Sequence, residues 1–120
     1  MKALVIGGGI GGLSAAVALK NAGIHCEVFE AVKEIKPVGA AISIWPNGVK
    51  CMKHLGMGDI IENYGGPMHF LAYKEYLRGE TLTQFSLAPL IARTGGRPCP
   101  VSRAELQREM LKFWGREAVQ

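Results

Sequence analysis

Apolar and polar positions near the start of the chain follow two different periods. Residues 3–6 form a short, continuously apolar run that ends in glycines, which is typical of a strand buried on both faces of a parallel sheet. Residues 10–21 repeat their apolar positions at helical spacing, and Gly23 provides a left-handed stop. Residues 25–29 then alternate as a second strand. The start of the chain therefore predicts a strand–helix–strand unit with parallel strands.

The pattern becomes less regular after this unit. Residues 38–43 are small and extended, and Pro46 is expected to open a helix that continues to Leu55 and is capped by Gly56. Asp59 is expected to cap a further short turn. A parallel sheet would usually continue with another regular helix and strand directly after the second strand. Here the small, extended segment 38–43 stands in their place.

The second half of the chain predicts a hairpin followed by a helix. Residues 68–73 and 81–87 are expected to pair as a hairpin on a second sheet, and 89–100 are expected to form a loop. Ser102 and Glu105 have the spacing of a capping box, which predicts a helix from there to about residue 114. Residues 118–120 are expected to begin another strand.

Composition and charge narrow the class of protein. The chain has 120 residues, 48% of them hydrophobic and 20% charged, which is enough for one small globular domain. The net charge of +4 comes from scattered basic residues and predicts no nucleic-acid partner. No apolar run approaches the roughly 20 residues of a membrane span. Three cysteines far apart argue against a disulfide framework or a zinc site and favour a cytoplasmic protein.

The candidate chemistry begins with the motif Gly7-x-Gly9-x-x-Gly12, between the first strand and the first helix. Gly7 permits a tight turn, Gly9 lets a pyrophosphate approach the backbone, and Gly12 lets the helix pack on the strands. The helix N-terminus offers N–H groups and a positive dipole end to phosphates, so the backbone at Gly11 is also expected to touch the ligand.

An acid supports this interpretation of the glycines. Glu30 ends the second strand about 20 residues later, where its carboxylate can accept hydrogen bonds from both hydroxyls of an adenosine ribose. The same charge would repel a 2′-phosphate, which argues against NADP in this site. Both NAD and FAD remain compatible with the fingerprint. The extended 38–43 segment favours an elongated cofactor, with Ser43 as a possible hydroxyl contact, although a tight packing strip is the alternative.

Several stretches together resemble the class A FAD-dependent monooxygenases. They are the glycine motif, Glu30, the run Gly39-Ala40-Ala41-Ile42-Ser43-Ile44-Trp45-Pro46-Asn47-Gly48 and the run Pro100-Val101-Ser102-Arg103-Ala104-Glu105-Leu106. The resemblance covers the whole chain and is strongest to the bacterial members that hydroxylate urate. It implies an α/β fold: the N-terminal part of a Rossmann-like FAD/NAD(P)-binding domain, incomplete over residues 1–120, with the beginning of an antiparallel substrate-side sheet.

The resemblance also implies site residues for FAD. Gly11 corresponds to a pyrophosphate contact, and Glu30 with Ala31 to the adenosine-ribose contacts. Ser43 corresponds to a flavin-side contact, and Arg103 to a basic residue that reaches the cofactor. A helix N-terminus is a poor dipole site for a cation, so electrostatics support the role of Arg103 only partly.

The activity implied by the resemblance is hydroxylation of an aromatic or purine ring with O₂. NAD(P)H, with NADH favoured, is the co-substrate that reduces the flavin, and urate would be converted to 5-hydroxyisourate. Full members of the family continue well past residue 120, so no catalytic residue and no metal ligand is assigned here. Another FAD-dependent oxidoreductase of the same superfold, and an inactive truncated fragment, are the alternatives.

Overall fold

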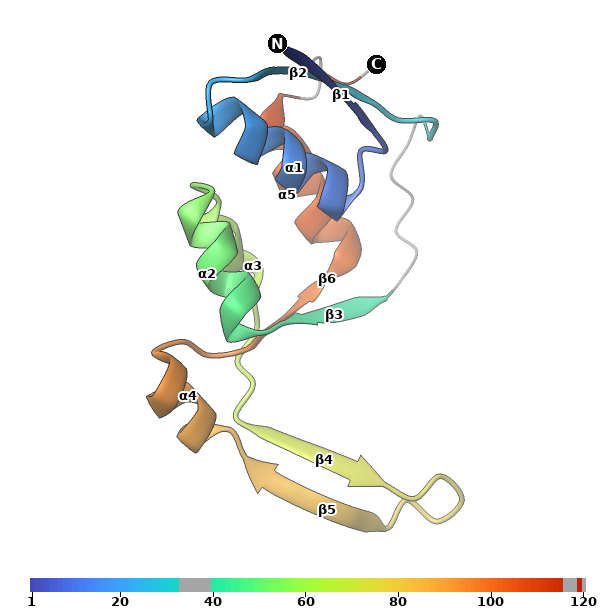
Figure 1. The fold of residues 1–120 in the computed structure, drawn as a ribbon. Helices are drawn as coiled ribbons and strands as arrows, with labels where there is room; N and C mark the ends of the chain where they lie inside the picture. Colours follow the sequence, from blue (N-terminus) through green and yellow to red (C-terminus); the bar gives the residue numbers. More distant parts are fainter. Residues whose placement is uncertain (33–39, 116–118, 120) are drawn as a thin grey trace.

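The computed structural model describes residues 1–32, 40–115 and 119, which form a mixed α/β structure (Figure 1). In chain order the elements are β1 (Lys2–Ile6), α1 (Ile10–Asn21), β2 (His25–Phe29), β3 (Ala41–Ile44), α2 (Pro46–His54), α3 (Gly58–Tyr64), β4 (Phe70–Lys74), β5 (Thr81–Ser86), α4 (Ala88–Thr94), β6 (Cys99–Ser102) and α5 (Arg103–Trp114).

The first three elements form the predicted strand–helix–strand unit. Strands β1 and β2 pair in parallel, with Val5 opposite Val28. One face of this pair packs on α1, and Ala16 of the helix and Val28 of the strand are fully buried there. Gly23 ends the connection to β2 with a φ of +74°. The predicted unit is confirmed, and the bounds of α1 and β2 are those expected from the sequence.

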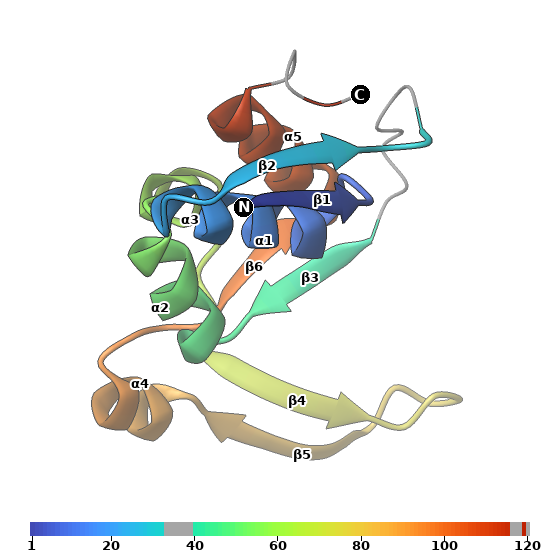
Figure 2. The ribbon, with the colours of Figure 1, turned by 45° about the horizontal axis from the view of Figure 1, so that its top comes forward.

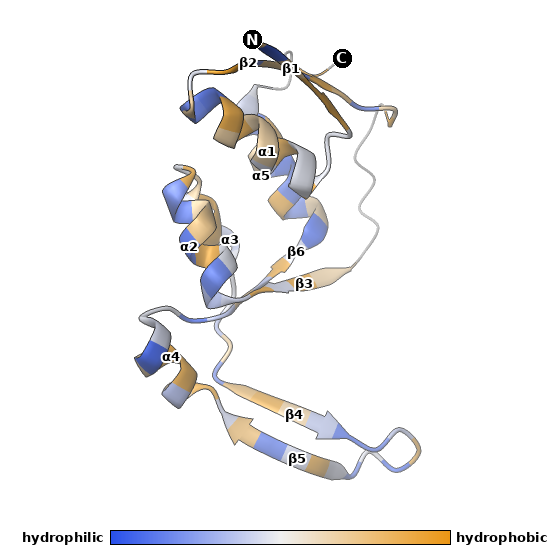
Figure 3. Cartoon of the chain, viewed as in Figure 1, coloured by the Kyte–Doolittle hydropathy of each residue, from blue (hydrophilic) through white to orange (hydrophobic). Residues whose placement is uncertain are grey.

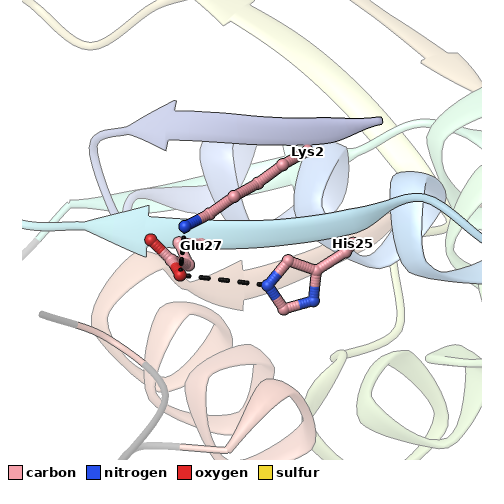
Figure 4. Close-up of polar contacts among 3 residues, drawn as sticks. All are labelled: Lys2, His25 and Glu27. Atoms are coloured by element: carbon pink, nitrogen blue, oxygen red, sulfur yellow. Dashed lines mark ion pairs between the residues drawn. The ribbon is translucent and has the colours of Figure 1, made fainter.

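The other face of the β1–β2 pair is exposed in this structure. Leu4 is 61% and Ile6 80% exposed, so the prediction that the first strand is buried on both faces is wrong for the described residues. The reason is the small sheet: α1 covers one face, and none of the described residues covers the other. On this outer face Glu27 forms an ion pair with Lys2 at 2.7 Å and lies 3.8 Å from His25 (Figure 4).

The main core lies between the helices. Its fully buried side chains include Leu13 of α1 and both Leu106 and Met110 of α5, while α3 contributes Ile61. In Figure 1, α1 and α5 lie side by side below the β1–β2 sheet, and α2 and α3 flank the lower part of this layer. Helix α5 is therefore anchored by core packing directly beneath the first strands.

Strands β3 and β6 form a short antiparallel pair below the helices. Ser43 stands opposite Pro100 in this pair. Residues 40–43 of the extended stretch are described and enter β3 at Ala41, whereas 38 and 39 lie outside the described residues. Helix α2 opens at Pro46 as predicted, and Gly56 follows it with a φ of +84°.

The prediction of a loop over 89–100 is corrected, because this segment contains most of α4 and the first half of β6. Pro89 stands in the first turn of α4, where a missing N–H costs nothing, and Gly95 ends the helix with a φ of +68°. Pro100 is tolerated because, within the part of the chain that the structure describes, β6 pairs with β3 alone.

The predicted hairpin on a second sheet is confirmed as β4 and β5, which pair antiparallel. Its body and its turn extend away from the rest of the chain (Figure 2). The radius of gyration is 17.0 Å, whereas a compact domain of this length would have about 14 Å. The difference reflects this projecting arm. The arm carries apolar stretches (Figure 3), and its side chains Phe70, Tyr73 and Leu82 are exposed.

Two helix starts differ in detail from expectation. Met57, not Asp59, is the N-cap of α3, and Asp59 lies within the first turn. At α5, Ser102 Oγ accepts from the Glu105 N–H at 3.4 Å, which is the first half of the predicted capping box. Helix α5 ends at Gly115 as expected.

The last strand expected from the sequence is described at one residue. Val119 forms a parallel bridge to Val28, while the other two residues of that strand, 118 and 120, lie outside the described residues.

Candidate functional site

The turn between β1 and α1 is built from glycines and fastened to the end of β2. Gly7 has a φ of +103°, a conformation that favours glycine. Its N–H donates to the Phe29 carbonyl oxygen at 2.7 Å. The chain therefore reverses sharply at the carboxyl ends of two parallel strands, which is where ligands bind in open α/β sheets.

Gly12 is required by close packing within this turn. A Cβ built at position 12 would lie 1.8 Å from the carbonyl oxygen of Gly7 and 3.3 Å from the Val5 side chain. Any side chain would force α1 away from β1. The role predicted for the third glycine, close approach of helix to strand, is therefore what the geometry requires.

The outer side of the turn is open. A Cβ built on Gly9 or Gly11 meets no atom within 4 Å. Gly9 is the N-cap of α1, no side chain of the described residues caps its first turn, and that turn contains no acid. The first N–H groups of a helix lack intrahelical partners and carry a partial positive charge. The turn can therefore accept an anion such as a diphosphate.

Glu30 lies at this turn, as its spacing predicted. Its Oε2 accepts the Gly8 N–H at 2.7 Å, and its Oε1 accepts the Val32 N–H at 2.9 Å. These donors, Val32 first and Gly8 second, hold the pKa of Glu30 below its usual value. The carboxylate is therefore ionised at neutral pH, and its remaining lone pairs can accept hydrogen bonds from the hydroxyl groups of a sugar.

Of the other predicted site residues, Ala31 adjoins Glu30, whereas Ser43 and Arg103 lie on a different part of the fold. Ala31 is exposed directly after Glu30. Ser43 is exposed on β3, and Arg103 is exposed at the start of α5. The Arg103 N–H donates to the Ala40 carbonyl oxygen at 3.0 Å, so β3 and the start of α5 are fixed to each other through the backbone. Among the described residues no side-chain hydrogen bond joins Ser43 or Arg103 to Glu30.

One polar contact at the turn was missed by the sequence reasoning. The Gln107 side chain, on α5, donates from Nε2 to the Gly8 carbonyl oxygen at 3.0 Å. Gln107 follows Arg103 by four residues and so shares its face of the helix. That spacing was visible in the sequence, but a contact across 99 residues could not be read from it.

Residues 1–115 match the protein family described as FAD binding domain. The chain belongs to this family. It is 90% identical over all 120 residues to a FAD-dependent urate hydroxylase from Klebsiella oxytoca, and 47% identical over 115 residues to a FAD-dependent urate hydroxylase from Mycolicibacterium vanbaalenii. The crystal structure of Klebsiella pneumoniae HpxO complexed with FAD and uric acid is 73% identical, with a TM-score of 0.90 over the whole chain.

These relatives are much longer than the chain. The chain spans 31% of the Klebsiella oxytoca relative, 29% of the Mycolicibacterium relative and 30% of the Klebsiella pneumoniae crystal structure. The comparisons confirm the predicted fold class, the N-terminal portion of a FAD-binding fold. In the described part of the chain, no helix is both long enough and apolar enough to cross a bilayer.

Proposed function

We propose that this chain is the N-terminal FAD-binding portion of a urate-hydroxylating monooxygenase, and that residues 1–120 hold the adenosine-diphosphate half of the cofactor. The observation that carries the proposal is the position of Glu30, whose ionised carboxylate lies against an open glycine turn at a helix N-terminus. A diphosphate needs the turn, and the neighbouring ribose needs the acid. The 2.7 Å hydrogen bond from the Gly8 N–H to Glu30 supports this proposal, because it joins the turn to the acid.

The described residues fit each part of that half of FAD. The diphosphate would lie over Gly9 and Gly11, where open space and uncapped N–H groups coincide. The adenosine ribose would lie at Glu30 and Ala31. The negative charge at position 30 favours a free 2′-hydroxyl over a 2′-phosphate, which suits FAD and disfavours NADP in this site.

Ser43 and Arg103 would contact the cofactor from the β3–β6 side. Ser43 would offer its hydroxyl toward the flavin end, and Arg103 its guanidinium toward a phosphate oxygen. The backbone hydrogen bond from Arg103 to Ala40 supports this proposal, because it fixes the start of α5 to the start of β3, the two elements that carry these side chains. Their exposure leaves both side chains accessible to a ligand.

When bound, the flavin would supply the redox chemistry, taking electrons from NADH and activating O₂ for insertion into a ring. Urate is the proposed substrate and 5-hydroxyisourate the proposed product, because relatives sharing 90% and 76% identity over the entire chain are FAD-dependent urate hydroxylases. We place the reaction in the cytoplasm, which suits the three free thiols of the chain.

The test uses the full-length protein. It should purify with a flavin absorption spectrum and oxidise NADH faster when urate is added, with formation of a hydroxylated product. Xanthine, which differs from urate in having no carbonyl at C8, is the matched control and should not stimulate NADH oxidation. Equal NADH consumption with and without urate, and no hydroxylated product, would contradict the urate assignment.

A further inference from the structure

The Gly8 residue is held from two sides by side chains that are distant in sequence. Its N–H donates to Oε2 of Glu30 at 2.7 Å, and its carbonyl oxygen accepts from Nε2 of Gln107 at 3.0 Å. Gly8 is buried, and Gln107 is partly buried beside it. Both polar groups of one residue in the ligand-binding turn are therefore fixed before any ligand arrives.

Gln107 makes its bond from a rigid support. The residue before it, Leu106, and Met110 one turn later are both fully buried in the main core. Helix α5 therefore cannot shift relative to α1 without opening that core. The amide group of Gln107 is a fixed point against which the glycine turn is oriented.

Holding the Gly8 carbonyl also sets the direction of the next N–H group. The described chain contains no cis peptide bond, so the Gly9 N–H points opposite to the Gly8 carbonyl across a planar peptide. Since that carbonyl points toward Gln107, the Gly9 N–H points away from α5. A Cβ built on Gly9 meets no atom within 4 Å, so this residue borders open space.

We propose that Gln107 is a positioning residue for FAD: it orients the Gly8–Gly9 peptide so that the Gly9 N–H is aimed at the diphosphate, without itself touching the cofactor. The inference rests on the proposed FAD function of the turn. Preorganisation of this kind raises affinity because the free protein has less freedom to lose on binding. Glu30 accepts a hydrogen bond from the N–H of Gly8, and Gln107 donates one to its carbonyl oxygen. The proposed ribose-binding acid and the positioning residue therefore both fix Gly8.

Four variants of the full-length protein separate the hydrogen bond from simple packing. Gln107→Met keeps the length of the side chain but removes the donor, and Gln107→Glu replaces the donor with an acceptor that faces the Gly8 carbonyl. Gln107→His retains an N–H donor. Arg108→Met is the matched control, since Arg108 is the next residue of α5 and is exposed.

The measurements are FAD affinity of the apoprotein by titration, hydrogen exchange of the peptide over 7–12 without FAD, and the thermal midpoint. We expect Gln107→Met and Gln107→Glu to bind FAD about three- to tenfold more weakly, the range of one lost hydrogen bond. Exchange over 7–12 should be faster in both. Gln107→His should recover most of the affinity, and Arg108→Met should match the wild type.

Two results would overturn the inference while leaving the proposed function intact: wild-type FAD affinity in Gln107→Met, or a loss in Gln107→His as large as in Gln107→Met. The second result would show that packing, not the donated hydrogen bond, is what matters. A wild-type apoprotein that does not bind FAD would instead overturn the proposed function, and this inference with it. Because that failure appears in the wild type, the cases are distinguishable.

Discussion

Gly12 lies so close to Gly7 that a single added carbon at position 12 would stand 1.8 Å from the Gly7 carbonyl oxygen. The neighbour is backbone of the same turn, so it cannot rotate aside as a side chain could. We expect Gly12→Ala to lower the free energy of unfolding by about 3 kcal/mol or more, at the upper end of overpacking effects. Urea unfolding of the full-length protein measures this loss.

Gly11→Ala is the matched control for that change. A Cβ at position 11 meets no atom within 4 Å, and alanine is favoured over glycine within a helix by up to about 1 kcal/mol. Gly11→Ala should therefore leave the urea midpoint unchanged or raise it. Equal destabilisation by both substitutions would show that the contact between Gly12 and Gly7 is not the cause.

Gly9→Ala should separate cofactor binding from folding. The added methyl meets no protein atom within 4 Å, and the φ of −73° at Gly9 is accessible to alanine. The urea midpoint should stay within about 0.5 kcal/mol of the wild type, as for a surface change. FAD affinity should fall at least tenfold, because the methyl would occupy the space in which the diphosphate meets the backbone. Unchanged affinity would place the diphosphate elsewhere.

Glu30→Ala should weaken FAD binding for two reasons. It removes charge-assisted hydrogen bonds to the ribose, each of about 1.5–3 kcal/mol, and it releases the Gly8 N–H from its acceptor. We expect at least a tenfold rise in the dissociation constant, measured by flavin fluorescence. Glu27→Ala is a control, because Glu27 pairs with Lys2 on the outer face of the sheet and has no role in the turn. Wild-type FAD retention in Glu30→Ala would mean that the ribose lies elsewhere.

The same carboxylate predicts a dependence of stability on pH. The folded-state pKa of Glu30 is lowered by the Val32 and Gly8 N–H groups, so its contribution is fully present above the ordinary glutamate pKa of 4.5. The contribution is lost as pH falls through the lowered folded value. The difference in unfolding free energy between the wild type and Glu30→Gln should be constant from pH 7 to about 5 and shrink in more acidic solution. A difference that grows on acidification would reverse this assignment.

The projecting hairpin predicts self-association of a peptide limited to residues 1–120. Leu77 is 85% and Leu82 68% exposed, and the outer face of β1 is also uncovered. Light scattering should give a mass well above the 12.9 kDa of the single chain. Replacing both leucines with serine should lower that mass, whereas Thr81→Ser should not. A monodisperse wild-type peptide would contradict the prediction.

The part of the fold that could be predicted from sequence is the part governed by local rules. The elements around the glycine turn follow from hydrophobic period and glycine placement, and Glu30 follows from a fixed spacing within a single βαβ unit. These constraints act over about 30 residues and do not depend on the rest of the protein. They were sufficient to locate the acid at the turn.

The predictions failed where a residue type is compatible with two structures, or where the outcome depends on distant parts of the chain. Pro89 and Gly95 predicted a loop, yet they are the start and stop signals of the short helix α4. Strand β6 was missed because its partner β3 is distant in sequence: Pro100 pairs with Ser43. The exposure of Leu4 and Ile6 depends on what covers the sheet, which the local pattern cannot reveal.

The bond from Gln107 to Gly8 joins positions 99 residues apart, and this has a consequence for biosynthesis. A nascent chain displays the glycine sequence at the outset, but the turn acquires its second support only after α5 has left the ribosomal tunnel. Before that helix emerges, the nucleotide should bind the nascent turn about three- to tenfold more weakly, and a product that ends before α5 would carry the glycine motif without this second hydrogen bond.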